Sequence, residues 1–356
     1  MCNKFDDFAH QASEFSLPLD PTLKAQFSLP AVCAPMFLVT GPELVIEACK
    51  AGVMGCVPRQ NAGTMEEFES WLSQIQAELR AYKEQFPEER IGPVAVNLAT
   101  RRPASELRDD LAVCKRYGVR IIISATGDPS ELIREVHDWG GLVFHDVVSM
   151  RFAEKAIRAG ADGLTCIATG GGGHSGGLSP LVFVPKVRSI FNGTILMAGC
   201  IATGGAIRVA EILGADLAYM GTRFIATKEA KVDLAYWDML VNGTSSDLIF
   251  TDKVSGVAAN WLITSMQRVG IDLDKLPDLA GKVMRSDHLP IHIKPWRDIW
   301  SAGQALDLIN DVPSTKSLIA RLKSEYEFAC SLPQFGDTQE MGGGTSEGPN
   351  AARFRQ

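Results

Sequence analysis

The sequence predicts an α/β protein that folds as a (β/α)8 TIM barrel, followed by an additional helical lid or side domain. Short apolar, β-leaning runs alternate with amphipathic helical segments eight times between residues 31 and 240. The strand-like runs are almost continuously apolar, as expected of parallel strands that are covered on both faces. A doubly wound sheet is the competing architecture, because repeated units alone do not show that the sheet closes.

The first unit illustrates how each element is recognised. The run AVCAPMFLV (31–39) ends at Thr40-Gly41-Pro42, where proline suits the first position of a helix. Thr64 and Glu67 have capping-box spacing at the start of the longest helix. Strands are expected at 31–39, 52–58, 93–98, 118–126, 141–147, 164–167, 194–201 and 217–224. Helices are expected at 43–51, 61–86, 103–117, 129–139, 150–159, 181–191 and 203–213.

The alternation stops after the eighth unit, and the following segment contains too many helical patterns for one closing helix. Helices are expected at 230–240, 256–269, 275–284, 296–308 and 314–330. Some of them should cover the barrel mouth. The predicted organisation is an N-terminal extension (1–29), a barrel (30–240), a helical lid or side domain with the closing helices (241–335) and a flexible tail (336–356).

Composition and charge limit the classes of partner and the cellular location that we expect for this protein. The chain has 356 residues, and 35 Lys and Arg against 42 Asp and Glu give a net charge of −7. This balance argues against nucleic acid or an anionic membrane as partner. No apolar run approaches the ~18 residues of a membrane span, and the first residues lack a signal-peptide pattern. Eight scattered cysteines without a C-x-x-C pair favour reduced thiols over a metal site. We expect a cytoplasmic protein that binds no metal.

Residues 160–177, GADGLTCIATGGGGHSGG, form the centre of the predicted site. A strand leads into four consecutive glycines, His174, Ser175 and two more glycines. Glycine lets the backbone approach a ligand closely and adopt positive φ. His174 is the only residue of this loop that exchanges a proton near neutral pH. The loop alone leaves open the alternative of a flexible segment with a solvated histidine.

Other candidate residues stand at strand ends, where barrel enzymes place their chemistry. They are Pro35–Met36, Asn97, Ser124, His145, Gly170–His174, Ala198–Gly199 and Gly221–Thr222. The two glycine-rich loops after the seventh and eighth strands favour a phosphate site at Gly199, Gly221 and the Thr222 hydroxyl. Ordinary glycine turns are the alternative there. Other residues are interpreted as structural. We expect Trp237, Trp261 and Trp296 in the hydrophobic core, and we expect the Arg223 side chain to point outward and form a structural ion pair. His137, Asp146 and Asp162 are interpreted as turn, cap or surface residues.

Five motifs in this order resemble the nitronate monooxygenase family, formerly called 2-nitropropane dioxygenase, whose members are FMN-dependent barrels. The motifs are APM at the first strand end, VNL at the third, GADGL with GGGGHSGG at the sixth, AGCIATGG at the seventh and MGTRF at the eighth. SGVAANWL (255–262) also resembles the segment after the barrel in that family. The resemblance covers residues 30–270 and depends on the order and placement of individually weak motifs.

The resemblance implies that FMN lies across the barrel mouth. Ala34, Pro35 and Met36 would pass beside the isoalloxazine ring, and Asn97 would hydrogen-bond its polar edge. The phosphate would be held by Ala198, Gly199, Gly221 and Thr222, while Gly172 and Gly173 would let the loop approach the flavin. His174 matches the catalytic base. Relatives often carry a lysine at the fifth strand end, near the pyrimidine edge of the flavin, and here that position is assigned to His145.

The resemblance implies oxidation of alkyl nitronates or nitroalkanes by O₂ to a carbonyl compound and nitrite, with His174 as the base. An NAD(P)H-dependent reductase of quinones or enoyl thioesters on the same flavin barrel is the alternative. The sequence has no separate G-x-G-x-x-G motif for nicotinamide binding after a strand. This absence argues only weakly against the reductase. A phosphate-binding barrel without flavin and a flavoprotein sensor also stay open. The expected partners are a small-molecule substrate and O₂, and a homodimer is possible.

Overall fold

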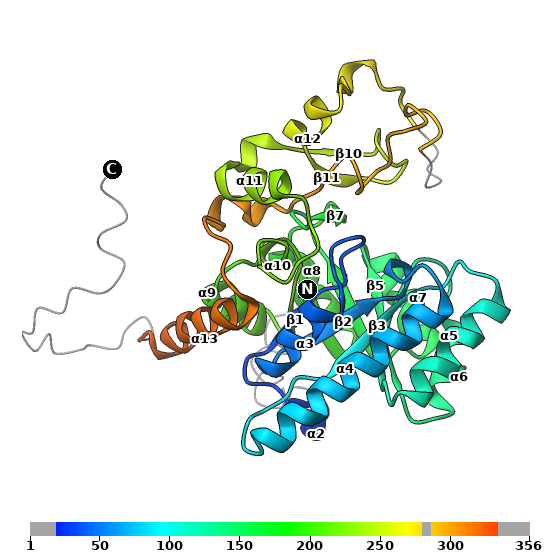
Figure 1. The fold of residues 1–356 in the computed structure, drawn as a ribbon, viewed down its shortest axis with the longest axis vertical. Helices are drawn as coiled ribbons and strands as arrows, with labels where there is room; N and C mark the ends of the chain where they lie inside the picture. The colour runs from blue at the N-terminus through cyan, green and yellow to red at the C-terminus, as the bar shows by residue number, and fades with distance from the viewer. Residues whose placement is uncertain (1–18, 280–285, 334–356) are drawn as a thin grey trace, which may run out of the picture.

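The computed structural model describes residues 19–279 and 286–333 and contains the predicted closed barrel (Figure 1). Eight parallel strands follow one another around the barrel in the order β1-β2-β3-β4-β5-β6-β8-β9, and β9 pairs with β1. The strands are β1 (Ala31–Cys33), β2 (Met54–Pro58), β3 (Val94–Ala99), β4 (Ile121–Ala125), β5 (Leu142–Val147), β6 (Gly163–Ile167), β8 (Thr194–Ala198) and β9 (Leu217–Met220). The (β/α)8 prediction is confirmed, and closure excludes the doubly wound alternative.

Helices cover the outside of the barrel. Seven follow the first seven barrel strands: α3 (Pro42–Lys50), α4 (Met65–Gln85), α5 (Ala104–Arg116), α6 (Ser130–His137), α7 (Met150–Ala159), α8 (Pro180–Arg188) and α9 (Gly204–Ile212). The predicted cap of α4 is present, because the Thr64 hydroxyl accepts a hydrogen bond from the Glu67 N–H. The eighth helix is α13 (Thr315–Ser331), which packs beside α9 and α3. None of the described helices is long and apolar enough to cross a membrane.

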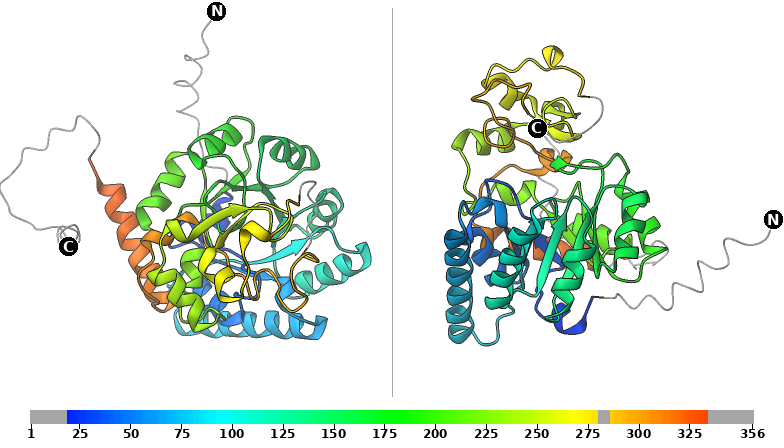
Figure 2. Two further views of the ribbon diagram at one scale, coloured as in Figure 1. Left: turned by 90° about the horizontal axis from the view of Figure 1, so that it is seen from above. Right: turned by 90° about the vertical axis from the view of Figure 1, so that its right-hand side faces the viewer.

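The chain between β9 and α13 forms an insertion above the barrel mouth (Figures 1 and 2). It holds α10 (Thr222–Ile225), α11 (Leu234–Asn242), α12 (Ile263–Arg268), β10 (Leu248–Thr251) and β11 (Ala259–Leu262). β11 lies between β10 and the short strand β7 (Gly173–His174), which belongs to the glycine-rich loop. A small antiparallel sheet therefore joins this loop to the insertion.

Three expected helices of the insertion are wrong. Residues 259–262 form a strand because Trp261 and its neighbours are buried in the small sheet, so only Ile263–Arg268 is helical. Residues 276–279 are not helical, since Pro277 breaks the pattern, and 280–285 lie outside the described residues. Within 296–308 only Gln304–Leu308 forms a 3₁₀ helix. Tertiary pairing overrides helical periodicity here.

The barrel interior is filled by side chains that alternate along the strands with those facing the helices. Met54, Ala95, Ile123, Phe144 and Leu196 belong to one interior cluster. Leu19, Leu23 and Phe27 from the N-terminal extension join this cluster, with Leu23 on the short helix α2 (Pro21–Lys24). The described part of the extension thus closes the amino-terminal end of the barrel. Residues 1–18 and 334–356, which include the predicted tail (336–356), lie outside the described residues.

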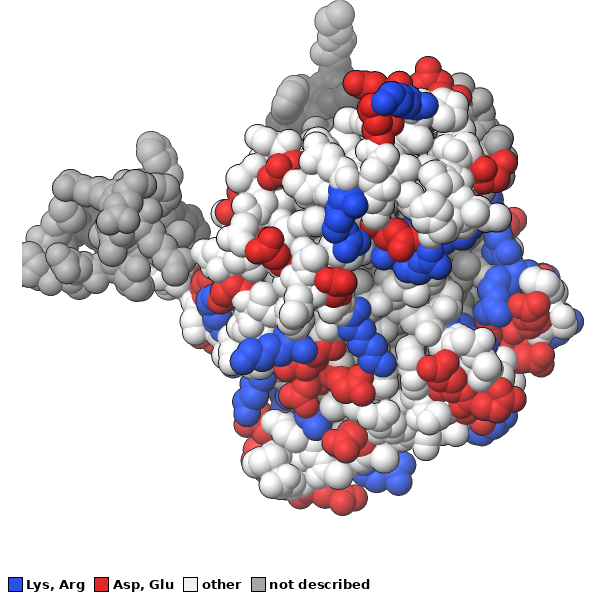
Figure 3. Space-filling view, turned by 45° about the horizontal axis from the view of Figure 1, so that its top comes forward, with Lys and Arg blue, Asp and Glu red and all other residues white. Residues whose placement is uncertain are grey.

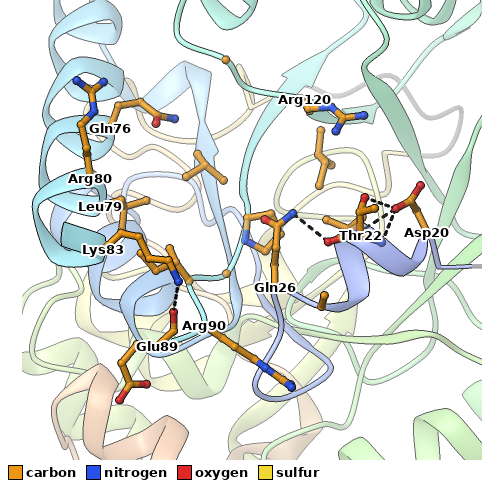
Figure 4. Close-up of a pocket in the computed structure, with 18 of the residues that line it drawn as sticks. Asp20, Thr22, Gln26, Gln76, Leu79, Arg80, Lys83, Glu89, Arg90 and Arg120 are labelled. Atoms are coloured by element: carbon orange, nitrogen blue, oxygen red, sulfur yellow. Dashed lines mark hydrogen bonds between the residues drawn. The ribbon is translucent and has the colours of Figure 1, made fainter. Parts of the chain in front are cut away.

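A cavity of about 530 Å³ opens at this amino-terminal end, between α2 and α4 (Figure 4). Its walls carry cations and anions together, and two of its cations bind backbone oxygens. Lys83 donates to Glu89 O at 2.8 Å, and Arg90 donates to Phe27 O at 2.9 Å. These contacts tie α4 and the loop before β3 to the extension, which gives the cavity walls a structural role.

Gly163 in β6 should be intolerant of a side chain. A Cβ atom there would lie 2.4 Å from Cδ1 of the fully buried Phe144 ring. We expect Gly163→Ala to destabilise the protein by about 1–3 kcal/mol, the usual cost of overpacking a core. Urea unfolding would measure it. Gly205→Ala in α9 is the matched control, because its Cβ would meet only Thr203 Oγ1 at 3.9 Å, and it should be neutral or stabilising.

Candidate active site

A second cavity, of about 630 Å³, lies at the carboxyl ends of the barrel strands. The insertion supplies part of its wall through Tyr236, Trp296, Ser301, Gly303 and Ala305. Figure 3 shows acidic and basic side chains interspersed around the insertion and the barrel mouth. Because this end of a barrel carries the strand-end loops, the cavity is the candidate active site.

The structure brings most of the predicted site residues together around this cavity. Eleven of them line it: Ala34, Pro35, Met36, Asn97, Gly172, Gly173, His174, Ala198, Gly199, Gly221 and Thr222. Asn97 donates its Nδ2 hydrogen to Ile123 O at 3.0 Å, which leaves its Oδ1 as an acceptor toward a ligand. The roles assigned to these residues stay predictions.

Ser124 and His145 do not line the cavity. The Ser124 hydroxyl lies 2.8 Å from His145 Nδ1, and both residues are buried. Side chains alternate along a strand, and Phe144 in β5 belongs to the barrel interior, so His145 faces the helices. Burial lowers the pKa of His145 to about 4, so its imidazole is neutral at pH 7. The structure therefore does not bring these two predicted cofactor-binding residues to the cavity.

Asp146 occupies the inward position at the end of β5 and lines the cavity. The side chain that faces the cavity at the end of β5 is therefore the Asp146 carboxyl group and not the His145 imidazole. Burial raises the pKa of Asp146 to about 7. Interpreting Asp146 as a turn, cap or surface residue was wrong. The sequence predicts that side chains along the strand point alternately to its two faces. It does not show which of the two alternating sets of residues faces the inside of the barrel.

His174 lies in β7, where pairing with Ala259 of β11 holds its backbone. Its Nε2 is 3.2 Å from Ser255 Oγ, and the Ser255 hydroxyl donates to Val257 O at 3.0 Å. Since the serine has one proton and uses it there, Ser255 accepts from His174 Nε2–H. Nδ1 then carries the lone pair, and it has no partner within the described part of the chain. Burial lowers the pKa of His174 to about 4, so the ring is a neutral base at pH 7.

Trp296 is a site residue that the sequence interpretation placed in the core. It lines the cavity and meets the His174 ring edge-on, with centroids 4.9 Å apart and an interplanar angle of 85°. The Trp261 ring also packs against Trp296, with ring centroids 4.8 Å apart. Trp296 has φ of +62°, a left-handed conformation that is unusual for a large residue and is found at functional sites. The pair thus limits rotation of the imidazole.

The loops after β8 and β9 offer backbone donors to an anion. The N–H groups of Gly199, Cys200, Gly221 and Thr222 have no acceptor among the residues that the structure describes. Thr222 Oγ1 accepts from Gly303 N–H at 2.9 Å, so its own proton remains available. Unpaired backbone N–H groups on two adjacent loops can donate hydrogen bonds to the oxygens of a phosphate group.

Close packing explains two of the glycines. Gly199 has φ of +112°, and a Cβ there would lie 2.8 Å from Thr169 O. At Gly172 a Cβ would lie 2.9 Å from Thr222 Oγ1 and 3.0 Å from Gly303 N. The glycine-rich loop therefore packs against the returning insertion as well as facing the cavity. Arg223 forms the expected structural pair, an ion pair with Asp311 at 2.8 Å, but its side chain is 2% exposed and does not point outward.

Comparison with known proteins agrees with this architecture. The family model for nitronate monooxygenase matches residues 21–325. A nitronate monooxygenase of Paraburkholderia phytofirmans is 24% identical, with 84% of this chain and 92% of that protein covered. An indene-carboxyl-CoA dehydrogenase of Mycobacterium tuberculosis is 25% identical over 67% of this chain. The chain spans about half to two thirds of the length of the first curated relatives it matches.

Two solved structures share the fold. A FabK variant from Thermotoga maritima superposes with a TM-score of 0.66 at 25% identity, covering 87% of this chain and 95% of that one. A nitroalkane oxidase from Streptomyces ansochromogenes has a TM-score of 0.67 at 21% identity, covering 86% and 99%. The match of the family model over most of the chain, together with the closed barrel, shows that this chain belongs to the nitronate monooxygenase family.

Proposed function

We propose that the chain is an FMN-dependent enzyme that oxidises alkyl nitronates or nitroalkanes with O₂ to a carbonyl compound and nitrite. The observation that carries the proposal is His174, a half-buried neutral imidazole whose Nδ1 lone pair is unpartnered within the described residues of the cavity. The family match supports the reaction class. A cytoplasmic location and a homodimer stay predictions from the sequence.

The cavity fits FMN in three respects. Unpaired N–H groups of Gly199, Cys200, Gly221 and Thr222 suit a phosphate. Asn97 Oδ1 offers an acceptor to the N–H of a flavin's polar edge. Small residues such as Ala34, Ala198 and Gly171 leave room for a flat ring. When bound, FMN supplies the one-electron chemistry and the reaction with O₂ that protein side chains lack.

The residues of this chain perform the proton step. A proton α to a nitro group is acidic enough for an imidazole to remove, so His174 Nδ1 takes that proton and leaves a nitronate anion. Ser255 holds Nε2 protonated, which keeps Nδ1 as the basic atom. Tyr236 and Trp296, supplied by the insertion, cover the cavity and exclude water from the reacting carbon.

The second candidate is an NAD(P)H-dependent reductase of quinones or enoyl thioesters on the same flavin barrel. It is favoured by the fold shared with FabK and by the similarity to a relative named for a carboxyl-CoA compound. Arg101 lies in the cavity wall and forms no ion pair with another described residue. Its guanidinium group therefore suits the negative charge of a nicotinamide dinucleotide, the electron donor of such a reductase.

Anaerobic reduction of the FMN-loaded protein separates the two candidates. Flavin absorbance near 450 nm is followed after addition of an alkyl nitronate, NADH or NADPH in separate cuvettes. Bleaching by the nitronate alone supports the proposed reaction. Rapid bleaching by NADH or NADPH, with none by the nitronate, would replace it by the reductase. Protein that takes up no FMN would exclude both.

Ser255→Ala should impair catalysis without unfolding the site. The substitution removes the acceptor of His174 Nε2–H, so both tautomers of the ring become populated and the fraction with a basic Nδ1 falls. We expect kcat on neutral nitroalkanes to fall about 10-fold, within the range for loss of an outer-shell partner. Steady-state kinetics measures it, and Ser255→Thr, which keeps the hydroxyl, should recover most of the rate.

A further inference from the structure

Two polar side chains lie side by side next to the cavity. Asp146 in β5 and Thr165 in β6 are direct partners in the strand register. Asp146 Oδ1 and Thr165 Oγ1 are both buried and make no hydrogen bond of ordinary geometry to a described residue, and the interaction of the Thr165 hydroxyl with the Asp146 carboxyl group only partly offsets the effect of burial on the pKa of Asp146. Thr165 is fully buried, whereas Asp146 keeps some exposure and lines the cavity. The partly exposed Asp146 carboxyl group is therefore the polar group that this pair presents to a ligand in the cavity, and such groups are almost always hydrogen-bonded when a ligand buries them.

The groups facing Asp146 provide no counter-charge. Cys56 of β2 and Tyr219 of β9 are the titratable side chains that interact with its charge across the interior. Burial raises the pKa of both the Cys56 thiol and the Tyr219 phenol well above their usual ranges, so both are neutral. Elsewhere on the cavity wall, the His174 ring is neutral above pH 5 and burial raises the pKa of Cys200, while Arg101 supplies a guanidinium group. Among these groups only Asp146 changes charge near pH 7.

We propose that Asp146 is a flavin-binding residue that acts as a neutral carboxylic acid, so that FMN uptake by this chain is linked to a proton on Asp146. The inference rests on the proposed function. A ligand that fills the cavity displaces water from the carboxyl group, which raises the cost of its ionised form. The neutral acid also offers one donor and one acceptor, whereas a carboxylate offers acceptors only. Protonation therefore favours the liganded state.

The test is the dissociation constant of FMN, measured by quenching of flavin fluorescence from pH 5.5 to 8.5. For the wild type, Kd should rise about tenfold per pH unit above pH 7, or about 30-fold by pH 8.5, as linkage of one proton requires. Asp146→Asn is neutral at every pH and should lack this rise. The FMN phosphate, with a pKa near ~6, contributes equally to both proteins and cancels in the comparison.

Two further measurements test whether the pH dependence of FMN binding comes from Asp146. Asp138→Asn removes an exposed carboxylate at the end of α6 and should keep the wild-type slope. Calorimetry of FMN binding to the wild type at pH 7.5, in two buffers of different ionisation enthalpy, should show proton uptake without any substitution. Equal pH slopes for wild type and Asp146→Asn, or no proton uptake, would overturn the inference alone. Failure of every variant to bind FMN would overturn the proposed function and the inference together.

Discussion

His174→Ala is expected to lower turnover of neutral nitroalkanes by about 10²–10⁴-fold, the usual contribution of a positioned general base. The substitution removes the only neutral, proton-accepting ring on the described cavity wall. Preformed alkyl nitronates need no base, so their oxidation should be largely retained. FMN should remain bound, because the N–H groups that we propose hold its phosphate lie on the loops after β8 and β9.

Steady-state kinetics on a nitroalkane and on its nitronate would measure this split. His137→Ala is the matched control, because this exposed histidine on α6 bonds Asp162 away from the cavity and should keep full activity. The pKa of His174 is lowered to about 4, so with saturating FMN at every pH nitroalkane turnover should be flat from pH 6 to 8 and decline only below pH 5. Equal nitroalkane activity of His174→Ala and wild type would remove the histidine from the mechanism.

Asp146→Asn is expected to stabilise the flavin-free protein above neutral pH. The folded-state pKa of Asp146 is raised from 3.8 to about 7, so its neutral form is favoured by folding. In the unfolded chain the group ionises near pH 4, and above that pH the folded protein must retain a proton or bury a charge. Stability is therefore lost as pH rises from about 4 to about 7, and a shift of this size corresponds to at most about 4 kcal/mol.

Urea unfolding of the flavin-free proteins between pH 4 and 8 would test this. The gain of Asp146→Asn over wild type should grow by about 1.4 kcal/mol per pH unit up to pH 7 and then stay constant. The pKa values of His145 and His174 are lowered, so their contribution to the stability of the protein is lost in the opposite direction, as pH falls from 6.5 toward 4. This contribution is the same in both proteins and cancels in the comparison. Asp138→Asn should show no such trend. A pH-independent difference would mean that the Asp146 carboxyl is solvated in the folded state.

The sequence by itself determined the barrel and the centre of its site. Eight apolar runs with helices between them leave few alternatives, because parallel strands need crossover helices and cover on both faces. The GGGGHSGG loop and the glycines after β8 and β9 were recognisable because close backbone approach demands glycine. His174 stood out as the one titratable residue in such a loop.

Only the tertiary structure decided which side chains share the cavity. Along β5 the sequence shows alternation, but closure of the barrel and the stagger of its strands set Asp146 inward and His145 outward. Trp296 and Ser255 reach His174 from the insertion, far along the chain, through a small sheet whose strand β11 was mistaken for a helix. Such contacts depend on long-range pairing, which local periodicity does not encode.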